Sequence, residues 1–103
     1  MFKTEKDLEQ AADRAAKGDK GAFVDVINAM LNDGDWEMRC LAAFSLIDHI
    51  PAWEIGQLII ILESVLAIKT FNAPTGVYRK TLRLLAFIAE SALRDRLDGA
   101  GVN

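Results

Sequence analysis

Apolar positions along this chain recur with the period of an α-helix. Apolar side chains that are spaced three and four residues apart fall on one face of a helix. The first such stripe consists of Leu8, Ala11, Ala12, Ala15 and Ala16. Comparable spacing returns in four later segments of the chain. We therefore predict no strands and five helices, over residues 5–17, 20–31, 36–50, 51–70 and 77–97.

Capping and turn residues separate the predicted helices. Thr4, Asp19 and Asp35 each stand directly before a helix, where a short polar side chain can accept a hydrogen bond from a free backbone N–H. Pro51 has no N–H to donate, so we expect it to end the third helix and to be the first residue of the fourth. Because the connections are short, consecutive helices are expected to be antiparallel neighbours.

A chain of 103 residues without a linker or a low-complexity segment is expected to form one domain. We assign residues 1–18 to an N-terminal capping helix, 19–50 to a first helical hairpin and 51–97 to a second. Residues 72–76 are the clearest loop, and residues 98–103 are expected to be a frayed tail. The predicted fold is an all-α bundle of about five helices, built from antiparallel hairpins.

One helical pattern occurs twice in the sequence. The segment Asp35–Leu46 is followed about 40 residues later by a similar segment, Thr75–Ala86. Each begins after a turn signal and has an apolar residue followed by an arginine, Arg39 or Arg79, in its first turn. An apolar helical run then follows in both. This spacing indicates a repeated structural unit.

The first copy resembles the second helix of a HEAT-type repeat, with Arg39 in its first turn and two small residues, Ala42 and Ala43, before Leu46. The second copy keeps Arg79 but has Leu82 and Arg83 in place of the alanines. The resemblance implies a stack of helical hairpins, an α-solenoid, that binds proteins and in some cases nucleic acids, with no shared catalytic residues.

The resemblance also implies a role for the repeated arginine, which in that family bonds carboxylates in neighbouring loops. For Arg39 the candidates are Asp33 and Asp35, and an anion site is the alternative. Because two hairpins are fewer than solenoids usually need, three further possibilities stay open. These are a compact HEAT-like bundle, a fragment-sized solenoid and a protomer that stacks on another copy. The alternative to the resemblance itself is an unrelated five-helix bundle.

The fourth predicted helix is apolar on nearly every side. Its regular stripe is Ile55, Leu58, Ile59, Leu62 and Leu66. Three further isoleucines, Ile60, Ile61 and Ile68, fall outside this stripe. A helix of this kind is either central in its own fold or shared with a partner. We predict that these three isoleucines form the interface of a homo-oligomer, such as a dimer, unless flanking helices bury them.

The last predicted helix carries one straight stripe of mostly charged residues: Lys80, Arg83, Phe87, Glu90 and Arg94. With the neighbouring Arg79, its first half is locally basic. The stripe is either a solvated outer face or a protein-binding face with an aromatic anchor. Our candidate binding residues are Arg79, Lys80, Arg83, Phe87 and Arg94. The same face could bind nucleic acid, although a net charge of −3 disfavours that partner.

Chemistry-bearing residues are sparse. Cys40 and His49 are nine residues apart, which places them on opposite sides of one helix, and the chain has no second Cys or His. We therefore expect no catalytic site, metal or cofactor. The first residues lack the apolar run of a secretory signal, and no segment is long enough to span a bilayer. The sequence predicts a soluble, cytoplasmic and non-catalytic interaction or assembly module.

Overall fold

The computed structural model describes residues 2–68 and 76–101, and the described residues are almost entirely helical, with no strand. The all-α prediction is confirmed. The elements are α1 (Glu5–Ala16), α2 (Lys20–Asn32), α3 (Trp36–Asp48), the 3₁₀ turn η1 (Ile50–Ala52), α4 (Ile55–Ala67) and α5 (Gly76–Gly101). The loop predicted at residues 72–76 lies outside the described residues except for Gly76, which begins α5.

The three predicted N-caps are confirmed, because each side chain accepts a backbone hydrogen bond. Thr4 Oγ1 accepts from the N–H of Asp7 at 3.1 Å, and Asp19 Oδ1 accepts from that of Ala22 at 3.0 Å. Asp35 Oδ1 accepts from the N–H of Glu37 at 2.9 Å. Each cap satisfies a donor that has no partner inside the helix.

The predicted boundaries around Pro51 and at the end of the last helix are wrong. Pro51 lies inside η1, and α4 begins only at Ile55. The start of α4 is set by a capping box, in which the backbone N–H of Glu54 donates to Gln57 Oε1 at 2.9 Å. Residues 98–101, predicted to be a frayed tail, continue α5. Each residue added to an existing helix gains a hydrogen bond. This gain offsets the entropic cost of ordering the glycines in that segment.

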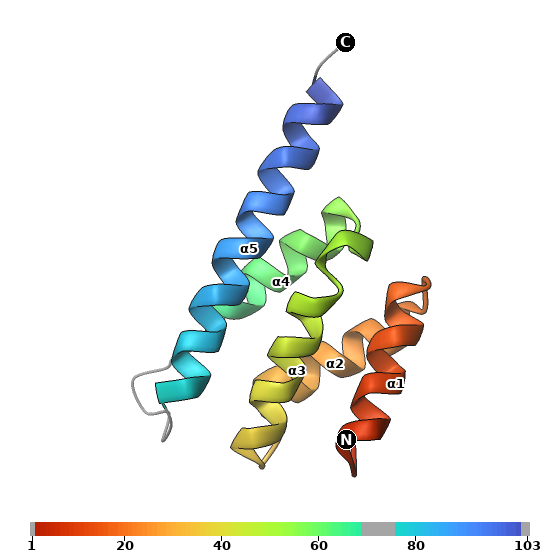
Figure 1. Cartoon of the computed structure of the whole chain (residues 1–103), viewed down its shortest axis with the longest axis vertical. Helices are drawn as coiled ribbons and strands as arrows, with labels where there is room; N and C mark the ends of the chain where they lie inside the picture. Colours follow the sequence, from red (N-terminus) through yellow and green to blue (C-terminus); the bar gives the residue numbers. More distant parts are fainter. Residues whose placement is uncertain (1, 69–75, 102–103) are drawn as a thin grey trace.

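The helices form two layers (Figure 1). α1, α3 and α5 lie side by side and run in the same direction, while α2 and α4 cross behind them in corresponding positions. α3 packs against α1, α2 and α5, and α4 packs mainly against α5. Consecutive helices are therefore neighbours within each hairpin. Between α3 and α4, however, η1 redirects the chain, and α5 becomes the principal C-terminal neighbour of α3.

The core lies between the two layers. Its largest fully buried side chains are Trp53, Tyr78, Leu8, Met30, Leu46, Leu58, Ile61, Leu85 and Val26. The alanine stripe of α1 is buried as predicted at Ala11, Ala12 and Ala15. Small side chains at these positions allow neighbouring helices to approach closely.

Hydrogen bonds connect the turn η1 and the residue after it to α3 on one side and to α5 on the other. The indole N–H of Trp53 donates to the backbone oxygen of Leu46 in α3 at 2.9 Å, and its ring meets Phe23 edge-on with centroids 5.2 Å apart. From α5, the Arg96 guanidinium donates to the backbone oxygen of Trp53 and to that of Pro51, the latter at 3.0 Å. One arginine therefore joins the long last helix to the connection between the hairpins.

Candidate interaction surfaces

Arg39, the arginine of the first repeat copy, has a structural role. Its Nε donates to the backbone oxygen of Asp33, and its guanidinium lies 4.2 Å from the centroid of the Trp36 ring. The predicted carboxylate partners do not bind it. The Asp33 carboxylate instead accepts from the N–H of Asp35 at 2.9 Å and shapes the turn before α3.

Tyr78, beside the arginine of the second copy, connects α5 to the end of α2. Its hydroxyl donates to the backbone oxygen of Met30 at 2.7 Å, and its ring meets Trp36 edge-on, with centroids 5.2 Å apart. Burial raises the pKa of Tyr78 above its ordinary value, and the nearby Arg39 partly opposes this rise. Arg79 is half-buried next to Tyr78, so it does not belong to the exposed stripe of α5.

The other predicted residues of α5 are exposed and share one side of the helix. Lys80, Arg83 and Arg94 are exposed, and the side chain of Phe87 is 71% exposed. Arg94 pairs with Glu90 at 2.7 Å, an exposed ion pair of small net energy. Sequence reasoning missed Leu84, which is 45% exposed within this stripe. Its position four residues after Lys80 and three before Phe87 was the available signal.

We call this set of residues (Lys80, Arg83, Leu84, Phe87 and Arg94) the α5 ridge. It has an apolar centre with cations on both sides along the helix axis.

The predicted interface on α4 is wrong at Ile61. That side chain is 0% exposed, and Ile68 is half-buried, so only Ile60, at 46%, is largely accessible. The buried side of α4 is formed by Leu58 and Ile61, whereas Leu66 of the predicted stripe is 82% exposed. Because the helix is apolar nearly all round, periodicity alone could not identify the side that its neighbours cover.

The two ends of the helical stack differ in polarity. Within α1, which is described completely, every exposed side chain is polar or charged. At the opposite end, α4 and α5 carry seven of the nine exposed large apolar side chains found among the described residues. These seven are Ile59, Ile60, Leu66, Val77, Leu84, Phe87 and Leu97.

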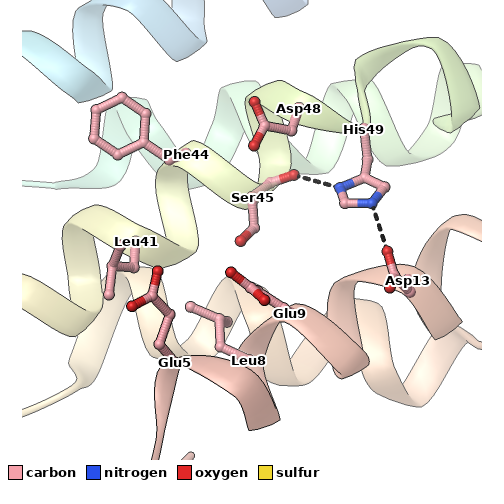
Figure 2. A pocket seen from close by; sticks show the side chains of 9 residues that line it. All are labelled: Glu5, Leu8, Glu9, Asp13, Leu41, Phe44, Ser45, Asp48 and His49. Atoms are coloured by element: carbon pink, nitrogen blue, oxygen red, sulfur yellow. Dashed lines mark hydrogen bonds and ion pairs between the residues drawn. The ribbon is translucent and has the colours of Figure 1, made fainter.

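A groove of about 270 Å³ lies between α1 and α3 (Figure 2). Its apolar lining includes Leu8, Leu41 and Phe44, and its lining also includes four carboxylates: Glu5, Glu9, Asp13 and Asp48. At one end, His49 Nδ1 donates to the backbone oxygen of Ser45 at 2.8 Å, and its Nε2 lies 3.0 Å from Asp13 Oδ1.

A second groove, of about 440 Å³, lies between α3 and the start of α5. It is lined by Trp36, Glu37, Cys40, Leu41, Phe44 and Val77. Leu41 and Phe44 line both grooves, so the two form one continuous surface, which we call the α1–α3 face. Cys40 is buried here, and burial, followed by the charge of Glu37, raises the pKa of its thiol. A thiol in this state is a poor nucleophile.

A third groove, of about 610 Å³, lies between the α1–α2 turn and the start of α4. Its apolar lining includes Phe23, Val24 and Ile60, and its charged lining includes Lys17 and Lys20. This groove is larger than the other two, but its charges have mixed sign because Glu54 also lines it.

The chain matches no family model, no curated protein and no solved structure. Over residues 2–68 and 76–101, no helix is long and apolar enough to cross a membrane. In the same part of the chain, no three Cys, His, Asp or Glu side chains are grouped so that they could hold a metal ion. Function is therefore to be inferred from the exposed surfaces themselves.

Proposed function

We propose that this chain is a HEAT-like helical module that acts by binding protein surfaces, and copies of itself in particular, and not by catalysis. The two-layer arrangement supports this proposal. α1, α3 and α5 form one layer, α2 and α4 form the other, and each hairpin stacks on the next. Repeat proteins of this type present extended surfaces for binding.

The observation that carries the proposal is the difference between the two ends of the stack. α1 has the polar outer side expected of a terminal cap, whereas α4 and α5 leave large apolar side chains in water. Small monomers rarely tolerate a large apolar patch, and full burial of a side chain such as Phe87 stabilises by roughly 1.5–3 kcal/mol. A second protein surface is the natural cover for this end.

Light scattering coupled to size exclusion tests the proposal. We expect the apparent mass to rise above 11.4 kDa as the concentration increases through the micromolar range. Phe87→Ser should weaken this association, whereas Val24→Ser, a matched change at an exposed apolar side chain of α2, should not. A mass of one chain at every concentration would contradict self-association.

One observation favours a second candidate function, which is binding of single-stranded nucleic acid. Lys80, Arg83 and Arg94 flank an exposed aromatic ring, Phe87, on which a base could stack. Fluorescence anisotropy with a labelled oligonucleotide at low salt tests this function. Binding that weakens with salt and is lost in Lys80→Glu/Arg83→Glu would support it, and no change in anisotropy at low salt would reject it.

A further inference from the structure

We propose that the α5 ridge of one copy docks on the α1–α3 face of a second copy. The inference rests on the proposed self-association and specifies the two surfaces that meet. It replaces the α4 interface expected from the sequence, because Ile61 is buried inside the chain.

The α1–α3 face has the chemistry of a receptor for a cationic apolar ridge. Its lining includes apolar side chains, and two of them, Leu41 and Phe44, join its two grooves. Its described lining includes no lysine or arginine. The charged side chains on it are five carboxylates, Glu5, Glu9, Asp13, Glu37 and Asp48, of which Asp13 bonds His49. A partner must therefore supply an apolar side chain and positive charge together.

The α5 ridge offers this combination. Phe87 and Leu84 are exposed at its centre, and with a rise of 1.5 Å per residue Arg83 and Arg94 lie about 6 Å and 10 Å from Phe87 on opposite sides. On the receiving face, Glu5 and Asp13 are separated by about 12 Å along α1. In the proposed contact, Phe87 packs against Leu41 and Phe44, and the cations of the ridge face the carboxylates that line the grooves.

Charge complementarity selects a second copy as the partner. The ridge carries three cations, of which Arg94 pairs with the neighbouring Glu90, on a chain whose net charge is −3. Most of the negative charge therefore lies elsewhere, in part on the α1–α3 face. Complementary patches orient two copies as they meet, and salt screens this effect. Because the ridge and the grooves are different surfaces, the contact is heterologous, and it can close into a pair or a ring or extend as a chain.

Two charge-reversal variants test the contact. The ridge variant is Lys80→Glu/Arg83→Glu, and the groove variant is Glu9→Lys/Asp48→Lys. All four side chains are exposed, so circular dichroism should show an intact fold. Light scattering should show each variant alone associating at least about tenfold more weakly than the wild type. An equal mixture should restore association, because the basic ridge of the groove variant meets the acidic grooves of the ridge variant.

Asp25→Lys/Glu63→Lys is the matched control for the groove variant, because it makes the same change from two carboxylates to two lysines at exposed positions on α2 and α4. It should associate like the wild type. The inference is overturned if the ridge and groove variants associate normally, if their mixture fails to recover, or if the control is the variant that dissociates. In those cases self-association still stands and its surface is different. A wild type that is monomeric at every concentration overturns both the inference and the self-association in the proposed function.

Discussion

Replacing Tyr78 with Phe removes a single buried hydroxyl and preserves the ring. The hydroxyl donates at 2.7 Å to the backbone oxygen of Met30, in the last turn of α2, where helix carbonyls lack a donor from their own helix. The ring of the variant can still meet Trp36 edge-on, as the tyrosine ring does with centroids 5.2 Å apart. The substitution therefore removes the hydrogen bond that joins the two hairpins, together with the interaction between this hydroxyl and Arg39.

The expected cost follows from the acceptor that remains. A typical hydrogen bond contributes about 1 kcal/mol net, but a buried acceptor left without a donor costs about 1–3 kcal/mol. Tyr78 is almost completely buried, so water cannot easily replace its hydroxyl. We expect Tyr78→Phe to lower the free energy of unfolding by about 1–3 kcal/mol. For a domain of this size, that loss lowers the melting temperature by roughly 5–15 °C.

Urea denaturation followed by circular dichroism measures this cost. Thr81→Val is the matched control, because it also removes one buried hydroxyl, which donates at 2.7 Å to the backbone oxygen of Val77. That oxygen lies four residues earlier in the same helix, so it also accepts the intrahelical hydrogen bond from the backbone N–H of Thr81 and keeps a donor when the hydroxyl is removed. The control should cost less. A loss below about 0.5 kcal/mol for Tyr78→Phe, or equal losses at both sites, would refute the reasoning.

The same side chain predicts a dependence on pH. Burial raises the pKa of Tyr78 above its ordinary value of 10, so the folded state holds this proton more tightly than the unfolded state. Stability should therefore fall as the pH rises above about 10, and Tyr78→Phe should lack this part of the decline. Tyr78 is the only tyrosine, so the absorbance of tyrosinate reports its pKa directly. A pKa at or below the ordinary value would contradict the burial argument.

Three further predictions concern the core, the hydrogen bonds around η1 and the buried thiol. Leu46→Ala, at a fully buried site, should lower the free energy of unfolding measured in urea by about 2–5 kcal/mol. Leu66→Ala, at an exposed site, should change it by no more than about 0.5 kcal/mol, and the reverse order would contradict the assigned core. Arg96→Gln should lower the free energy of unfolding by about 1–3 kcal/mol, because the guanidinium bonds to backbone oxygens around η1 are lost; an unchanged thermal midpoint would contradict this. Cys40 should react slowly with a thiol reagent in the folded protein and quickly in urea, and equal rates would show that its sulfur is accessible.

The candidate site was only partly predictable from the sequence. The stripe of the last helix was recognised at Lys80, Arg83, Phe87 and Arg94, because residues three and four positions apart share a side of a helix. The α1–α3 face was missed completely. Its residues on α1 and those on α3 are far apart in sequence, as the bond between Asp13 and His49, separated by 36 positions, illustrates. No local pattern brings such residues together.

The sequence by itself determined the helical class, the starts of the first three helices and the buried side of α1. These features depend on residues within about four positions of one another, such as Thr4 and the N–H that it caps. Only the tertiary structure decided which side of α4 is buried, because a helix that is apolar all round has no preferred side until its neighbours cover one. It also assigned Arg39, Tyr78 and Arg96 their backbone partners, since free carbonyls at turns and helix ends become neighbours of distant side chains only after the layers pack.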